Sequence, residues 1–177
     1  MSPSSFQKLS VWDVAYGLAL ALASVMAYEA SSVITPLFLH APADTVDKLW
    51  AVISAVFVFR DTRANSLSAG TSRLIATFVS FLLCLIYLSC LPAHPLGMMA
   101  LIAIGTPIMM LLERRSDIGL TAITTAVVMI VATSKPESAW QQPCLRLMDT
   151  TTGIAVGIAF KWVTSLLFYR VTGEEVR

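Results

Sequence analysis

The stretch from Arg146 to Phe168 constrains the fold most, because it is long and apolar enough to cross a bilayer. A spanning helix needs roughly 20 mostly apolar residues. Gly153 and Gly157 stand four residues apart in it, the spacing that lets two membrane helices approach backbone to backbone. Asp149 precedes them by another step of four, so a charge and a close-packing groove share one side of the predicted helix. The pattern predicts a helix that packs against protein rather than lipid.

Composition extends this prediction to the whole chain. Apolar residues make up 56% of the 177 residues and charged residues 13%, whereas charged residues form about 25% of a typical soluble domain. Polar segments separate six apolar stretches, which lie at residues 11–39, 49–59, 70–91, 96–112, 118–132 and 146–168. We therefore predict an all-α polytopic membrane protein with about six transmembrane helices. The predicted membrane domain is residues 11–170, between a lead at 1–10 and a tail at 171–177.

The charges of the short loops predict the orientation. Cytoplasmic loops of membrane proteins are enriched in Lys and Arg. If the N-terminus is inside, the inside set is Lys8, Arg60, Arg63, Arg73, Arg114, Arg115, Arg170 and Arg177, and the outside set is Lys48, Lys135 and Arg146. This imbalance predicts that both termini are cytoplasmic.

The two halves of the chain resemble each other at a nearly constant offset. Two dipeptides recur 71 residues later, Thr35-Pro36 as Thr106-Pro107 and Ala55-Val56 as Ala126-Val127. A third, Arg73-Leu74, recurs 73 residues later as Arg146-Leu147. We predict two three-helix repeats, approximately residues 11–91 and 96–170. Because each copy holds three spans, the second enters the membrane from the opposite side. Inverted repeats of this kind are a recurrent plan of transporters, with a site where the copies meet.

Charged residues in the predicted spans are candidates for a substrate or ion pathway, because an ionisable group in a membrane is costly. Glu29 is the strongest candidate, as a carboxylate that couples proton movement to anion movement. The alternative is a residue near the outer interface that is hydrogen-bonded to Tyr28 or to a neighbouring helix. Arg73 and Arg146 are suited to hold a carboxylate by two parallel hydrogen bonds. Alternatively, Arg73 is a positive charge at the inner face that fixes the orientation of the chain, and Arg146 forms a local ion pair with Asp149.

Weaker candidates have more ordinary alternatives. Arg60 and Arg63 either line an inner vestibule or form a solvated turn. Thr121 and Thr125 either form a polar wall or bond to the backbone of their own helix. Lys161 is expected to extend towards the inner interface. The predicted pathway residues are Glu29, Arg60, Arg63, Arg73, Thr121, Thr125, Arg146 and Asp149.

Other positions carry structural predictions. Ala15, Ala19 and Ala23 recur at steps of four and form a second predicted close-packing stripe beside that of Gly153 and Gly157. Thr45 with Asp47 offers a helix start, and Ser116 or Asp117 is expected to cap the fifth helix. The chain has no Ser/His/Asp set, paired-acid site, phosphate loop or metal-binding spacing. We therefore expect no enzyme, no cofactor and no metal site, and no basic run suggests nucleic acid.

Two stretches resemble the fusaric acid resistance / aromatic acid exporter superfamily, namely residues 50–88 and 140–160. The resemblance rests on Trp50, Ser66, Gly70, Arg73 and Thr77 in the first stretch and Trp140, Arg146, Asp149, Thr150 and Gly153 in the second. One departure is Ala76, where members often have Gly. The resemblance extends from about Val14 to Leu167.

The resemblance implies a function. Such proteins export aromatic carboxylic acids and other organic anions across the bacterial inner membrane, often beside a periplasmic adaptor protein. Larger members have two membrane halves, so the single unit seen here implies a homodimer surrounded by membrane lipids. We predict an inner-membrane transporter of organic anions, by a proton-coupled or channel-like route. The alternatives are a voltage-driven anion channel and a non-transporting membrane assembly subunit of a larger efflux complex.

Overall fold

The computed structural model describes residues 11–39 and 45–172, and these residues form helices joined by short turns. The α-helices are α1 (Val11–Leu39), α2 (Thr45–Val58), α3 (Arg63–Cys90), α4 (Pro95–Leu111), α5 (Ile118–Ser134) and α6 (Gln142–Thr172), with short 3-10 helices η1 (Arg115–Asp117) and η2 (Pro136–Gln141). The all-α prediction is confirmed for this part of the chain. The lead at 1–10 with Lys8, residues 40–44, and residues 173–177 with Arg177 lie outside the described residues.

Each predicted apolar stretch corresponds to one helix, but several helices begin earlier than hydropathy indicated. The prediction was wrong for α3, which starts at Arg63 and includes the polar residues 63–69. The reason is a local cap, since the Thr62 side chain accepts a hydrogen bond of 3.1 Å from the Asn65 backbone N–H, which satisfies an otherwise orphaned donor. Asp117 occupies the N-cap position of α5, yet its side chain makes no capping hydrogen bond.

Helix length separates the elements into two groups. Four segments are long and apolar enough to cross a membrane, namely Val11–Leu37, Arg63–Cys90, Arg115–Ser134 and Pro136–Arg170. The apolar helix α4 has 17 residues. α2 has 14 residues, a rise of about 21 Å at 1.5 Å per residue, which is shorter than the hydrocarbon core of a bilayer. The number of spans stays a prediction.

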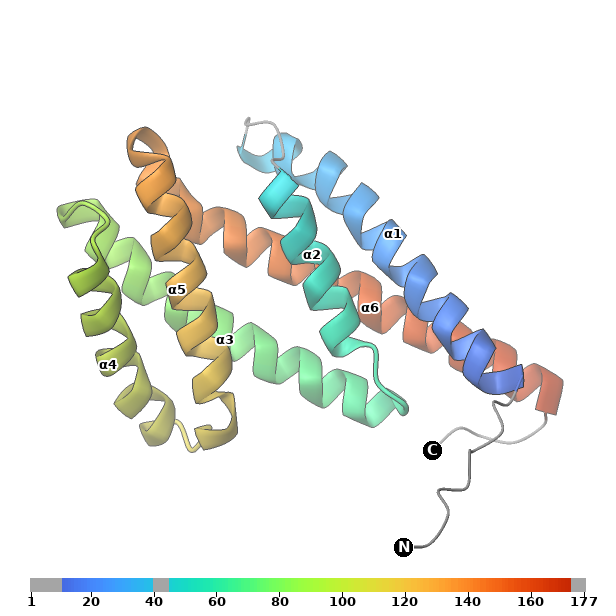
Figure 1. Ribbon diagram of the computed structural model, residues 1–177. Coiled ribbons are helices and arrows are strands. Elements are labelled where there is room, and N and C mark those ends of the chain that lie inside the picture. The colour runs from blue at the N-terminus through green and yellow to red at the C-terminus, as the bar shows by residue number, and fades with distance from the viewer. Residues whose placement is uncertain (1–10, 40–44, 173–177) are drawn as a thin grey trace, which may run out of the picture.

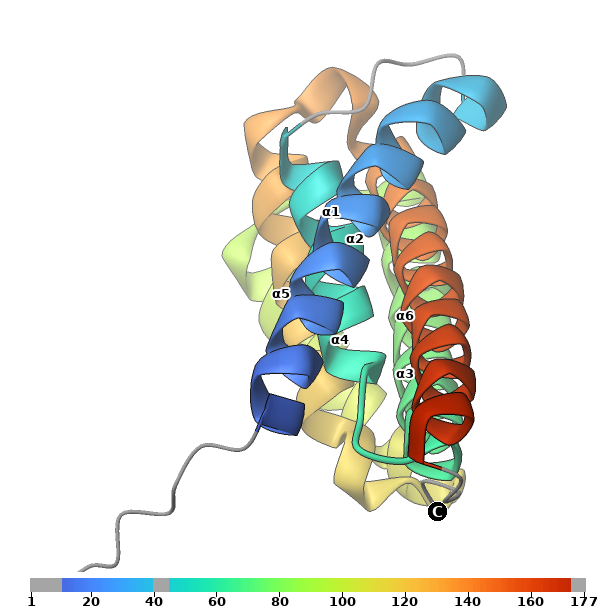
Figure 2. The ribbon, with the colours of Figure 1, turned by 90° about the vertical axis from the view of Figure 1, so that its right-hand side faces the viewer.

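The helices form two layers. α3 and α6 lie together behind α2 and α5, while α1 flanks α2 and α4 flanks α5 (Figure 1). α1 begins and α6 ends at one end of the bundle, here called the terminal end (Figure 2). α2 and α6 begin at the opposite end, here called the far end. Placing the terminal end in the cytoplasm stays a prediction.

The contact between α2 and α6 is the most extensive packing between the two predicted halves. α2 packs most extensively against α6, and α5 packs against α3 and α4. The α2–α6 and α3–α5 contacts each join one predicted half to the other. The inverted repeat itself stays a prediction.

Glycines bring α2 and α6 into backbone contact. A Cβ built on Gly153 would lie 2.2 Å from the Ala51 carbonyl oxygen, and one on Gly157 would lie 2.8 Å from that of Ala55. Only residues without a Cβ allow this approach. The glycine stripe is therefore covered by α2 of the same chain.

The alanine stripe of α1 divides along its length. Ala23 is fully buried, whereas Ala15 is exposed and Ala19 is half-buried. Ala15 and Ala19 line a cavity at the terminal end. The stripe therefore packs closely only in its second half.

Candidate functional site

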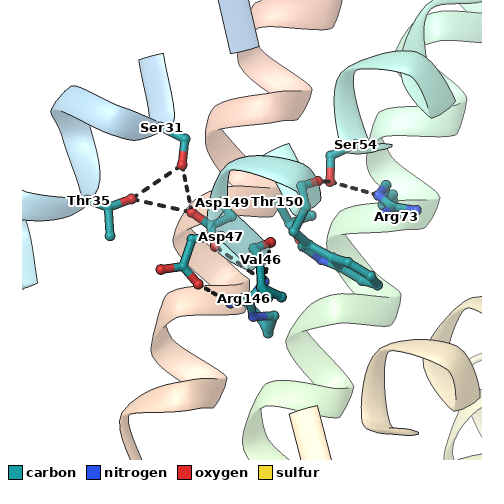
Figure 3. Close-up of polar contacts among 10 residues, drawn as sticks. Ser31, Thr35, Val46, Asp47, Ser54, Arg73, Arg146, Asp149 and Thr150 are labelled. Atoms are coloured by element: carbon teal, nitrogen blue, oxygen red, sulfur yellow. Dashed lines mark hydrogen bonds and ion pairs between the residues drawn. The ribbon is translucent and has the colours of Figure 1, made fainter. Parts of the chain in front are cut away.

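A cluster of buried charges joins the first turn of α2 to the first three turns of α6 at the far end. Arg146 is 1% exposed, and its guanidinium forms an ion pair with Asp47 of α2 (Figure 3). Its Nη1 atom lies 3.6 Å from Oδ2 of Asp149 and donates a hydrogen bond of 3.2 Å to the Val46 carbonyl. One guanidinium thus serves two carboxylates, so the cluster carries one net negative charge when both are ionised.

Helix α1 closes the cluster with two hydroxyl groups. The Asp149 carboxylate is fully buried. Its Oδ1 accepts hydrogen bonds from Ser31 Oγ at 3.1 Å and from Thr35 Oγ1 at 3.3 Å (Figure 3). Its Oδ2 accepts no hydrogen bond from the residues that the structure describes. Asp149 therefore lies where α1, α2 and α6 meet and keeps one oxygen atom available for a proton.

Arg73 of α3 lies beside this cluster and is linked to it through Trp50. Trp50 Nε1 donates a hydrogen bond of 3.0 Å to Thr150 Oγ1, next to Asp149. Arg73 Nε donates a hydrogen bond of 3.0 Å to Ser54 Oγ. The guanidinium carbon lies 5.4 Å from the centre of the Trp50 ring, within the range of a cation–π contact.

The two arginines differ in how their charge is compensated. Arg73 is 5% exposed, yet among residues 11–39 and 45–172 it forms no ion pair. Arg146 has a carboxylate on each side. A buried charge without a counter-ion is costly, and aromatic faces with one hydroxyl compensate it only in part. Arg73 is thus a buried cation without a counter-ion among the described residues.

The structure places the other predicted pathway residues apart from this cluster. Glu29 is exposed on α1, and Arg60 is exposed after α2. Arg63 Nε donates to Ser165 Oγ at 2.8 Å near the terminal end. Thr121 donates to the Asp117 carbonyl of its own helix start, whereas Thr125 donates to Ser80 of α3 at 3.0 Å.

Several residues of the cluster had no predicted pathway role. Asp47 was predicted only as part of a helix start, and Ser31 and Thr35 carried no prediction as donors. The usable signal was the spacing of Ser31 and Thr35, two hydroxyls four residues apart on a mainly apolar helix, which places both on one side.

The sequence model of the family described as "Fusaric acid resistance protein-like" matches residues 30–160. That range contains Arg73 and the whole Asp47–Arg146–Asp149 cluster. No curated protein and no solved structure matches the chain. Together with its long apolar helices, the match indicates a multi-pass membrane protein with a transport- or efflux-associated role. The chain belongs to the fusaric acid resistance protein-like family.

Proposed function

We propose that this protein moves organic anions such as aromatic carboxylic acids across the bacterial inner membrane. Family membership supports a transport-associated role. The observation that carries the proposal is Arg73, a buried guanidinium that has no carboxylate partner within the described chain. A guanidinium presents donors that match a carboxylate with two parallel hydrogen bonds. An arriving carboxylate would pair directly with Arg73.

The ring of the substrate also has a counterpart beside Arg73. Trp50 and Phe57 present their faces to the guanidinium, with ring centres 5.4 Å and 5.0 Å from its central carbon. Aromatic pairs add stabilisation beyond the burial of apolar area. A carboxylate attached to a ring therefore suits these neighbours better than an inorganic anion.

Charge balance supports coupling to protons, with Asp149 as the carrier. Arg73 and Arg146 balance Asp47 and Asp149 when both carboxylates are ionised. An anion bound at Arg73 adds one negative charge to this buried set, and a proton on Asp149 removes it. Anion binding and proton uptake therefore favour each other, as linkage requires. We propose Asp149 rather than the exposed Glu29 as this proton carrier.

We also propose a homodimer with the terminal end in the cytoplasm, working alongside a periplasmic adaptor. Glu29 lies on the outer face of α1 among exposed Val25, Met26 and Val33. A charged group on a lipid-facing surface is costly, and a second copy on this face would cover it. The glycine stripe does not provide this contact, because α2 already covers it.

Flux of benzoate into proteoliposomes of purified protein tests the proposal. We expect Arg73→Ala to lower the flux by about tenfold or more, since a hydrogen bond to a charged group contributes roughly 1.5–3 kcal/mol. Arg115→Ala is the matched control, because Arg115 is exposed in the turn before α5. Benzoate affinity should rise as the pH falls, over a range in which benzoate stays ionised, and Asp149→Asn should remove this dependence.

Other outcomes favour other functions. Flux that follows an imposed voltage, and that neither Asp149→Asn nor Glu29→Gln changes, would indicate an anion channel. A folded protein that carries none of several organic anions would leave the membrane assembly subunit as the better explanation. Equal loss in Arg73→Ala and Arg115→Ala would remove Arg73 from the proposed site.

A further inference from the structure

A cavity of about 730 Å³ lies at the terminal end, away from the Arg73 site. The start of α1 and the end of α6 form its walls, and Phe59 and Asp61 after α2 close one side. Ligand pockets commonly have volumes of about 300–1,000 Å³. The cavity is therefore large enough for a small organic molecule.

Lys161 supplies a buried positive charge to this cavity. It is 6% exposed and lines the cavity from α6. Its ammonium lies 5.7 Å from the centre of the Tyr16 ring and 5.6 Å from that of Phe59. Within the described ranges this ammonium makes no hydrogen bond and no ion pair. An ammonium has three donors, so this one has the capacity to bind an anion.

A second donor lies one helical turn along α6. Ser165 is 5% exposed and lines the same cavity. Its Oγ accepts the hydrogen bond from Arg63 Nε at 2.8 Å, so its own hydroxyl hydrogen remains available to donate. Hydrogen bonds polarise one another along a chain, and the Arg63 charge therefore strengthens Ser165 as a donor. Lys161 and Ser165 lie four residues apart, on one side of α6.

Two pairs of aromatic rings frame these donors. Trp12 and Phe168 meet edge to face with ring centres 4.5 Å apart, and Tyr16 and Phe59 have ring centres 5.2 Å apart. All four rings line the cavity. Such walls favour a flat apolar ring over a sugar or an inorganic ion.

The rim of the cavity limits the charge of a ligand. Asp13 and Asp61 line the cavity and are exposed, unlike Lys161. A second negative group on a ligand would meet these carboxylates, and like charges repel. The lining therefore favours a ligand with a single acidic group at one end.

We propose that this cavity binds an aromatic monocarboxylate, with the carboxylate on Lys161 and Ser165 and the ring between the Trp12–Phe168 and Tyr16–Phe59 pairs. The binding itself is independent of transport. Its role as a capture site on the cytoplasmic side rests on the proposed function, because export begins there.

Photolabelling with 4-azidobenzoate in phosphatidylcholine nanodiscs tests the site directly. The label should map to residues 12–19 of α1 or 164–168 of α6, and benzoate should compete for it. We expect Lys161→Gln to weaken this competition by about tenfold, the loss of one charged partner. Lys48→Gln is the matched control, because Lys48 also lies over a tyrosine ring, 5.1 Å from the centre of Tyr28, and lines no part of this cavity.

The variants separate this site from the Arg73 site. Arg73→Ala should leave the labelling at α1 and α6 unchanged, even if it abolishes flux or if no flux exists. Equal labelling of wild type and Lys161→Gln would overturn the proposal. Retention of phosphatidylglycerol by the wild type and not by Lys161→Gln, without competition by benzoate, would overturn it in favour of a lipid headgroup.

Discussion

Replacing Gly153 by alanine tests whether α2 and α6 touch through their backbones. The added Cβ would lie 2.2 Å from the Ala51 carbonyl oxygen and 2.6 Å from Ser54 Cβ. Normal contact requires about 3.5 Å, so the two helices would have to separate by about 1 Å. Both clashing atoms belong to or adjoin the backbone of α2, and no flexible side chain is available to move away.

The expected cost follows from two opposing effects. Gly→Ala within a helix stabilises by roughly 0.5–1 kcal/mol through backbone entropy. Overpacking a close contact costs about 1–3 kcal/mol, and the short contact with a carbonyl oxygen puts Gly153→Ala at the upper end of this range. We expect a net loss of about 2 kcal/mol in the free energy of unfolding.

Unfolding by SDS in mixed detergent micelles, followed by tryptophan fluorescence, measures this loss. Gly157→Ala should cost less, since its Cβ would lie 2.8 Å from the Ala55 oxygen. Gly17→Ala and Gly119→Ala are controls, because nothing lies within 4 Å of a Cβ at either position. These two variants should be at least as stable as the wild type. Equal stability of Gly153→Ala and Gly119→Ala would refute the backbone contact and with it the position of Trp50 beside Thr150.

Two further predictions concern orientation and assembly. Cys90 is exposed at the end of α3, Cys144 is half-buried near the start of α6, and Cys84 is fully buried. In a Cys144→Ser background, a membrane-impermeant maleimide should therefore label Cys90 in intact cells, whereas Arg115→Cys in a Cys90→Ser/Cys144→Ser background should react only after lysis. The reverse pattern would invert the proposed orientation. Glu29→Gln should change the dimer fraction in lipid several-fold. Glu113→Gln is the control, because Glu113 lies in the exposed turn after α4, and it should leave the dimer fraction unchanged. Identical dimer fractions in both variants would exclude the α1 face as the interface.

The regular part of the fold was predictable because it depends on local patterns. The stripe of Asp149, Gly153 and Gly157 indicated a helix face that packs against protein, and that face is buried. Its partner was not predictable, because Ala51 and Ala55 lie about 100 residues earlier in the chain. The alanines of α2 have the same four-residue spacing as the glycines of α6, but small residues at this spacing also occur in α1. Choosing between these partners needs the three-dimensional arrangement of the helices.

The start of α3 illustrates a different limit. Hydropathy marks where a chain meets lipid, whereas a helix begins where a side chain satisfies its free backbone donors. Thr62 provides that cap several residues before the apolar stretch. Arg63 therefore sits on the first turn of a helix, where it reaches Ser165, rather than in a solvated loop.

The charged site was predictable in its residues but not in its pairing. Arg73 and Arg146 occupy matching places in the predicted repeats, yet only Arg146 meets a buried aspartate on the neighbouring short helix. At the offset of 71, Asp47 corresponds to Ile118, and the nearest acid is Asp117, one residue earlier. One position turns a side chain by about 100° on a helix, and Asp117 instead lies 3.6 Å from Arg114. In the predicted repeat, this one-residue difference leaves Arg73 without a carboxylate partner among the described residues. The two arginines therefore have distinct roles in the proposed mechanism, in which Arg146 joins α2 to α6 and Arg73 receives the anion.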